Sequence, residues 1–291
     1  LLLNHRRGAL LNSDVLLIIP ISLMWLLAIG PTIQLLGIIS GVSNPVQWWT
    51  TGYISLILTM FLYMRYSLRT PSEFCLDLRF TVPPKSVLFS CLTMLLVATI
   101  GPLLFNATGN NVASMLAIIL VATIPTFLDR GGGFGNYLVL YSSALSILLV
   151  SSLVSNNVAG IDIQAEYYFS NSVLQLKLID FFSYGRYSTV LSTQGIVPLL
   201  SMWTGIPLTY VLKIIYPMIF SFCTALIYFS YSQLFDEDIA FYSTLMTIFT
   251  VSFYTSLLDV VRQGFAEIFM LSAIVLLCSS DDLRMYRNRV F

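Results

Sequence analysis

The chain has 291 residues, of which 57% are hydrophobic and 10% are charged, whereas soluble proteins average about 45–50% apolar and 25% charged residues. It is therefore predicted to be a multi-pass membrane protein. Its 14 basic and 14 acidic residues give no net charge, so there is no basic field for a nucleic-acid partner. The single histidine, His5, lies in a terminal His-Arg-Arg sequence, and this excludes a histidine-ligated metal centre.

Several apolar stretches are long enough, as helices, to cross a membrane, which takes about 20 residues. They predict an all-α integral membrane protein with about eight transmembrane helices. In chain order the predicted spans cover residues 14–39, 47–63, 86–104, 112–128, 137–153, 208–231, 240–257 and 264–278. The first four form an N-terminal membrane region, residues 1–136, and the other four belong to a second module, residues 137–291.

The longest interruption separates the fifth predicted span from the sixth. Residues 155–207 are mostly polar and contain a short apolar piece, residues 196–203, bounded by Pro198, Gly205 and Pro207. This piece is too short to cross a membrane, so it is predicted to be re-entrant or interfacial. The second module therefore has a large loop that carries helices at the membrane surface.

The basic residues are unevenly divided between the two sides of the predicted membrane. Three lie on the side of the large loop, namely Lys177, Arg186 and Arg262. Ten lie on the opposite side: Arg6, Arg7, Arg65, Arg69, Arg79, Lys85, Arg130, Arg284, Arg287 and Arg289. Because basic residues concentrate in cytoplasmic segments, both termini are predicted to be cytoplasmic, and the large loop is predicted to be extracytoplasmic at the cell membrane.

Two acidic residues in the large loop are the first candidates for a functional site. Asp162 and Glu166 are four residues apart, so in a helix their carboxylates lie on one face, one turn apart. Such a pair can act as base and orienter, or bind a metal. The aromatic run from Tyr167 to Phe169 suits a helix at a membrane surface. Asp162 is alternatively the N-cap of that helix, a position that aspartate favours.

Three further charged residues are predicted at the same end of the helical unit. Lys213 lies about five residues, or roughly 8 Å, inside the sixth span, while Arg262 and Glu267 lie at the start of the eighth. Ionisable groups at membrane depth are costly, which makes them functional candidates by default. Lys213 alternatively extends its amine to the headgroups, and Arg262 and Glu267 alternatively form a structural ion pair.

Three segments of the chain carry a resemblance to a known family. They read Gly160-x-Asp-Ile-x-x-Glu-Tyr-Tyr-Phe169, Val211-Leu-Lys-Ile-Ile-Tyr-Pro217 and Arg262-Gln-x-x-Ala-Glu267. They are similar to the successive motifs of a family of predicted multi-pass membrane proteins, mostly archaeal and of unassigned function, which itself resembles the GT-C superfamily of membrane glycosyltransferases. The resemblance covers residues 137–291, and residues 1–136 resemble the family's N-terminal membrane region more loosely.

The resemblance implies a GT-C-like glycosyltransferase in the membrane. The donor would be a sugar on a polyprenyl phosphate or diphosphate, and the acceptor a glycan, lipid or protein. In GT-C enzymes an acidic residue of the first external loop is the usual catalytic or metal-binding carboxylate, and Asp162 takes that position here. GT-C modules usually have more spans and a C-terminal soluble part, so residues 137–291 would be the N-terminal part of an incomplete module.

Glycosyl transfer from such a donor assigns a role to each of the five charged residues. Lys213 and Arg262 are the candidates for binding the donor phosphate, because fixed cations stabilise its developing charge. Asp162 is the candidate general base for the acceptor hydroxyl, with Glu166 or Glu267 as its orienter or as a metal partner. Asp162 and Glu166 can hold Mg²⁺ or Mn²⁺, although the neighbouring cations can replace the metal's charge.

Two other classes of function are compatible with the sequence. A lipid or glycolipid flippase or transporter would line a substrate path with intramembrane charges, and such proteins often contain internal repeats. No clear repeat relates residues 1–136 to residues 137–291. A non-catalytic membrane subunit of a glycan assembly system would use the four N-terminal spans, which contain almost no charge, as its assembly module.

Overall fold

The computed structural model describes residues 83–128, 130–176 and 192–279. These residues form helices, and no strand occurs among them. An all-helical architecture is thus confirmed for this part of the chain. The predicted spans at residues 14–39 and 47–63 lie outside the described residues.

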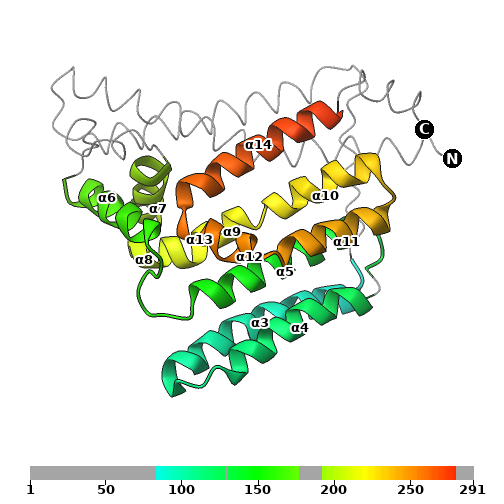
Figure 1. The fold of residues 1–291 in the computed structure, drawn as a ribbon, viewed down its shortest axis with the longest axis horizontal. Coiled ribbons are helices and arrows are strands. Elements are labelled where there is room, and N and C mark those ends of the chain that lie inside the picture. Colours follow the sequence, from blue (N-terminus) through cyan, green and yellow to red (C-terminus); the bar gives the residue numbers. More distant parts are fainter. Residues whose placement is uncertain (1–82, 129, 177–191, 280–291) are drawn as a thin grey trace. The chain divides into compact units, whose positions relative to one another are not determined.

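Figure 1 shows the described helices in chain order. Two π-helical turns, η2 and η3, lead directly into the α-helices that follow them. The bounds are Lys85–Thr108 (α3), Val112–Phe127 (α4), Gly133–Ser152 (α5), Asp162–Leu176 (α6), Ser192–Ile196 (η2), Val197–Thr204 (α7), Leu208–Tyr210 (α8), Val211–Ile215 (η3), Tyr216–Phe220 (α9), Cys223–Leu234 (α10), Glu237–Ile248 (α11), Val251–Tyr254 (α12), Ser256–Asp259 (α13) and Val261–Ser279 (α14).

Two compact units divide the chain. The first unit comprises Leu1–Arg79 with Tyr168–Gly205, and the second comprises Phe80–Tyr167 with Ile206–Phe291. Helix α6 begins in the second unit and continues into the first. The predicted division at residue 136 falls within the second unit, because α3 and α4 pack against α5 there.

Helix α5 is the central element of the second unit. It contacts α3 and α4 on one side and α10 and α11 on the other (Figure 1). Helices α3 and α4 approach each other closely at Gly101, where an added Cβ would lie 3.1 Å from the Ala113 carbonyl oxygen and 3.1 Å from the Ser114 Cα. Small residues at such contacts let helix backbones pack closely, as they do between helices in membranes.

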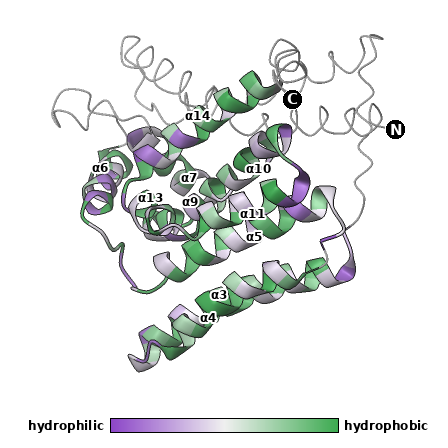
Figure 2. Ribbon diagram, turned by 45° about the vertical axis from the view of Figure 1, so that its right-hand side comes forward, coloured by the Kyte–Doolittle hydropathy of each residue, from purple (hydrophilic) through white to green (hydrophobic). Residues whose placement is uncertain are grey.

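Large apolar side chains cover the outside of α3 and α4. Phe89 is 71% exposed and Met115 is 57% exposed, and Figure 2 shows hydrophobic residues along most of both helices. Contiguous apolar surface of this kind is rare on soluble monomers. It is compatible with a surface that faces lipid chains.

Three described helices are long and apolar enough to cross a membrane, namely Lys85–Thr108, Gly133–Ser152 and Leu208–Leu234. The bent pair Glu237–Ile248 and Val251–Asp259 makes a fourth if it counts as one span. Helix α4, with 16 residues, is shorter. Several helices are therefore consistent with a membrane protein, and the total of eight spans stays a prediction.

The seventh predicted span, residues 240–257, is not a single helix. It breaks after α11, and the two parts meet at an angle of 60°. At the break Thr250 has an extended backbone, with φ −69° and ψ 140°. Thr250 and Val251 are β-branched, which lowers helix propensity by restricting their side chains against the preceding turn. This local weakness is a sequence signal for the break.

Candidate functional site

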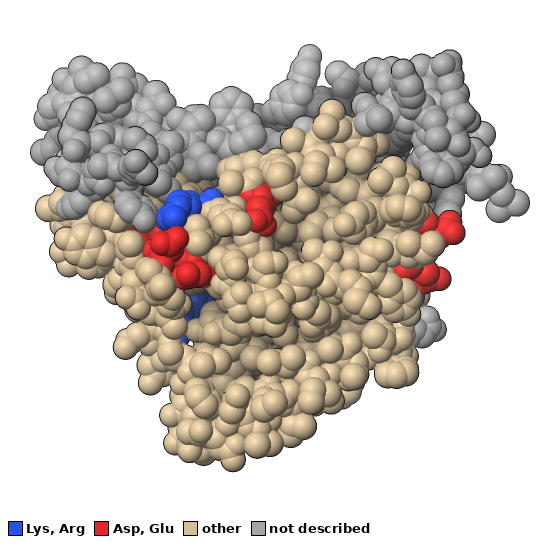
Figure 3. Space-filling model, viewed as in Figure 1, with Lys and Arg blue, Asp and Glu red and all other residues tan. Residues whose placement is uncertain are grey.

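Charged atoms are few on the face of the molecule shown in Figure 3, and uncharged residues cover most of it. Near the turn between α10 and α11, Asp238 pairs with Arg130 at 2.6 Å. A second charged cluster lies where α6 and α14 begin, and it contains Asp162, Glu166 and Arg262. Both helices contribute these residues from within the second unit.

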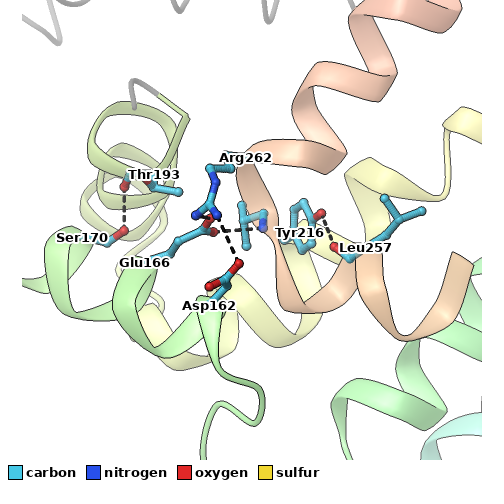
Figure 4. Close-up of polar contacts among 8 residues, drawn as sticks. Asp162, Glu166, Ser170, Thr193, Tyr216, Leu257 and Arg262 are labelled. Atoms are coloured by element: carbon cyan, nitrogen blue, oxygen red, sulfur yellow. Dashed lines mark hydrogen bonds and ion pairs between the residues drawn. The ribbon is translucent and has the colours of Figure 1, made fainter. Parts of the chain in front are cut away.

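Arg262 joins the two carboxylates of α6 (Figure 4). Its Nη1 donates to Glu166 Oε1 at 2.7 Å, and its Nη2 donates to Asp162 Oδ2 at 3.1 Å. Asp162 and Glu166 therefore lie on the same face of α6, one turn apart, as their spacing predicts. The planar guanidinium suits this arrangement because its fork can bind two acceptors at once.

Glu166 also binds the start of α14. Its Oε2 accepts a hydrogen bond from the Val261 backbone N–H at 2.9 Å. Val261 is the first residue of α14, so this N–H has no acceptor within the helix, and a carboxylate at a helix N-terminus is stabilised by the helix dipole. Glu166 thus fixes both the backbone and the side chain at the start of α14.

The three side chains differ in their access to solvent. The side chain of Glu166 is 1% exposed, that of Asp162 is 39% exposed and that of Arg262 is 31% exposed. A small molecule can therefore reach Asp162 and Arg262 but not Glu166. Asp162 and Arg262 are the members of the cluster that can contact a substrate, and Glu166 supports them from behind.

Burial raises the pKa of Glu166 from 4.5 to about 7, although the charge of Arg262 and the N–H donors of α14 act in the opposite direction. A raised pKa in the folded state means that the folded protein binds this proton more tightly than the unfolded chain does. The stabilisation is complete below pH 4.5 and is lost as the pH rises through about 7.

Glu166→Gln should therefore flatten the pH dependence of stability. The wild-type thermal midpoint should fall more between pH 5 and pH 8 than that of the variant, because the amide cannot ionise. Thermal unfolding of the detergent-solubilised protein, followed by fluorescence at a series of pH values, measures this difference. Parallel curves for the two proteins would contradict the raised pKa.

The N-cap interpretation of Asp162 is not what the structure records. Asp162 is the first residue of α6, and among the described residues the hydrogen-bond partner recorded for its carboxylate is Arg262, not a free amide of α6. The position at the helix start thus orients the side chain toward α14.

The alternative of a structural ion pair between Arg262 and Glu267 is not formed among the described residues. Arg262 pairs with Asp162 and Glu166, while Glu267 accepts a hydrogen bond from Gln263 Nε2 at 3.0 Å on an exposed part of α14. Five residues along a helix turn the side chain by about 140° from the first position, so Arg262 and Glu267 point in different directions. Glu267 does not join the carboxylates of α6.

Lys213 also lies apart from the carboxylates. It is 4% exposed, and its Nζ donates to the backbone carbonyls of Ser155 and, at 3.3 Å, Asn157. Both acceptors belong to the connection between α5 and α6. The ammonium is therefore neither extended to the lipid headgroups nor placed beside Arg262.

Asp259 and Gly160 form a contact that the sequence-based site did not include. Gly160 has φ +134°, which only glycine adopts readily, and an added Cβ would collide with Asp259 Oδ1. This oxygen is buried and has no hydrogen-bond partner among the described residues. The acidic residue three positions before Arg262, and the glycine two before Asp162, were the available sequence signals.

Tyr216 fixes α13 and α14 relative to α9. Its hydroxyl donates to the Leu257 carbonyl at 2.8 Å (Figure 4), and it lies directly against Gly264, where any larger residue would displace it. Gly264 is two residues after Arg262. The buried tyrosine therefore helps to position the part of α14 from which the Arg262 side chain projects.

The described residues do not fit a metal site by themselves. No group of three or more His, Cys, Asp or Glu residues is placed to hold a metal ion in this part of the chain. Asp162 and Glu166 each give one oxygen to Arg262, whose charge already neutralises part of theirs. Mg²⁺ is usually held by one or two carboxylates together with waters and substrate phosphates, so a metal at Asp162 and Glu166 would need the donor phosphate to complete its coordination.

The fold and site define the class of this protein only broadly, as an all-helical protein with helices able to span a membrane and one partly exposed cluster of Asp162, Glu166 and Arg262. No family model, curated protein or solved structure matches the chain. The GT-C resemblance therefore stays a prediction from the sequence motifs.

Proposed function

We propose that the chain belongs to a membrane glycosyltransferase that moves a sugar from a polyprenyl-phosphate donor to an acceptor hydroxyl. The observation that carries the proposal is the ion pair of Asp162 and Arg262. Both side chains are partly exposed and lie 3.1 Å apart, so a base and a phosphate-binding cation adjoin one another. Buried Glu166 holds Arg262 in place.

The proposed reaction uses these groups in one displacement. Asp162 removes the proton from the acceptor hydroxyl while the acceptor oxygen attacks the anomeric carbon of the donor. The bond between that carbon and the phosphate oxygen breaks, and the polyprenyl phosphate leaves with the bonding electrons. Arg262 stabilises the charge that develops on the phosphate, which fixed cations do well where water is excluded.

Arg262 also controls whether Asp162 is free to act. Without substrate, its Nη2 occupies Asp162 Oδ2. A donor phosphate is a strong competitor for this Nη2, because charge-assisted hydrogen bonds are stronger than neutral ones. The shorter bond of Nη1 to Glu166, 2.7 Å, keeps Arg262 at the site while Nη2 turns to the phosphate. Donor binding then frees the base.

Sidedness is part of the proposal and rests on the basic residues. The division of ten basic residues against three supports cytoplasmic termini and an extracytoplasmic α6. The substrates that this placement requires are a lipid-linked donor in the outer leaflet and a glycan, lipid or protein acceptor. Membrane lipids surround the apolar helices.

A flippase or transporter is the second candidate, and one observation favours it. The span from Glu237 to Asp259 is broken and bent by 60°, and discontinuous helices are typical of transporter binding sites. In transporters such breaks line a substrate path near the membrane midplane. In that case Arg262 would bind the lipid phosphate during its passage, and no glycosidic bond would form.

Vesicles distinguish the two candidates. The chain is extracted from its native membrane and reconstituted into vesicles. The vesicles receive polyprenyl-phosphate hexoses with a radiolabelled sugar, and acceptors with hydroxyl groups are added to the outer solution. We expect labelled product with a new glycosidic bond. Movement of labelled lipid across the bilayer without product would support the transporter, and neither product nor movement would contradict both.

A further inference from the structure

We infer that Lys213 is a positioning residue, which holds the connection between α5 and α6 and thereby sets where Asp162 meets Arg262. The inference rests on the proposed function and deepens it, because it replaces the phosphate-binding role that the sequence suggests for Lys213. In this role Lys213 positions the backbone segment that leads to Asp162, and Arg262 alone contacts the donor.

The surroundings of the ammonium carry the inference. Lys213 is 4% exposed, and a buried charge needs partners in place of water. The recorded partners are two backbone carbonyls, those of Ser155 and Asn157, and no carboxylate pairs with Lys213 in the described part of the chain. Both carbonyls lie in the connection that follows α5, and their oxygens accept hydrogen bonds from the ammonium.

A second contact runs in the opposite direction. The Ser152 hydroxyl donates to the Lys213 carbonyl at 2.8 Å. Lys213 lies in the middle of the π-helical turn η3, and π-helical turns alter the regular backbone hydrogen bonds of a helix. The same residue thus binds the end of α5 through its backbone and the following connection through its side chain.

Helix α3 holds the connection from another side. Asn106 Nδ2 donates to the Leu153 carbonyl at 2.8 Å. Backbone positions 153, 155 and 157 are therefore all bound by side chains from other helices. From Asn157 to Asp162 the chain can extend at most roughly 18 Å, and Gly160 packs against Asp259 on the way. Releasing Asn157 frees the segment that leads to the base.

A role of Lys213 in binding phosphate would require these contacts to break. Two of the three ammonium donors are already used, and the residue is almost fully buried. Arg262, in contrast, is 31% exposed. The two cations therefore have separate roles: Arg262 binds the donor phosphate, and Lys213 holds the backbone of the connection.

Two neutral variants separate hydrogen bonding from charge. Lys213→Gln loses the charge but keeps an N–H donor, whereas Lys213→Met loses both. Ile214→Met is the matched control, because Ile214 is the next residue and is 37% exposed. Each is made in the full chain after its four cysteines are replaced by alanine, with spin labels at the exposed positions Asn111 and Asn157.

The distance distribution between the two labels is the primary measurement. For Lys213→Met we expect it to broaden about two-fold, as local opening of the connection predicts, while Lys213→Gln and Ile214→Met stay close to the parent protein. In the transfer assay Lys213→Met should lower kcat and leave the donor KM unchanged, and Lys213→Gln should retain part of the activity.

The opposite pattern would overturn the inference. A narrow distribution in Lys213→Met, or a raised donor KM with equal losses in both neutral variants, would assign Lys213 to the phosphate instead. If Lys213→Met does not fold, Lys213→Gln gives the answer instead: a distance distribution as narrow as that of the parent protein, together with a raised donor KM, would overturn the inference. The distances need no sugar assay, so they test Lys213 even where the parent protein transfers no sugar.

Discussion

Asp162→Asn is expected to abolish sugar transfer while the protein folds normally. The amide keeps the size of the side chain and an oxygen that can accept from Arg262, but it cannot take a proton. General base catalysis contributes about 10²–10⁴-fold to the rate, so transfer should fall by that factor. The lost ion pair is 39% exposed at Asp162, and exposed pairs contribute only about 0–1 kcal/mol to the free energy of unfolding.

The measurement is transfer of labelled hexose in reconstituted vesicles, together with the thermal midpoint in detergent. Asp238→Asn is the matched control, because Asp238 also pairs with an arginine, Arg130, at 2.6 Å and is exposed. This variant should transfer sugar at the parent rate. Normal transfer by Asp162→Asn would remove Asp162 as the base, and a large loss of stability would make its role structural.

Much of the second unit could be predicted from its sequence. Long apolar stretches predict helices, and three of them are long enough to span a membrane. The four-residue spacing of Asp162 and Glu166 predicts a shared helix face. Alternating helix directions placed the start of α14 at the same end of the unit as α6, and so brought Arg262 close to them. These features follow from periodicity and chain direction alone.

The particular partners of each charge could not be predicted. Arg262 had carboxylates available on its own helix and on α6, and the choice between them depends on how α14 is rotated, which is a result of packing. Lys213 had headgroups, carboxylates and backbone carbonyls within reach. It binds the carbonyls of Ser155 and Asn157 because η3 and the end of α5 lie together. Such tertiary contacts leave no periodic signal in the sequence.

Arg262 should affect both activity and stability, and the two effects can be separated. Arg262→Lys keeps the charge but not the planar fork that binds Glu166 and Asp162 together. We expect transfer to fall about 10²-fold, as it does when one fixed donor to a developing anion is removed, while the fold survives. Because the donor phosphate meets only a point charge, donor KM should rise as well.

Arg262→Ala should destabilise the protein. It leaves Glu166, which is 1% exposed, without its counter-charge, and breaking a buried pair from one side costs about 3–5 kcal/mol. The cost should shrink at acidic pH, because Glu166 already has a pKa of about 7 and becomes neutral by binding a proton. Unfolding at pH 5 and pH 8 measures this difference.

The double variant Arg262→Ala, Glu166→Gln should recover stability at pH 8 without recovering transfer. The neutral amide of Gln can still accept from the Val261 N–H, so the start of α14 keeps its partner. Arg262→Ala, Glu267→Gln is the control and should recover nothing, because Glu267 binds Gln263 rather than Arg262. When two mutations remove both partners of one interaction, their effects on the free energy of unfolding are not additive. If the first double variant regained transfer along with stability, Arg262 would be a structural partner of Glu166 only, and the donor phosphate would have to bind elsewhere.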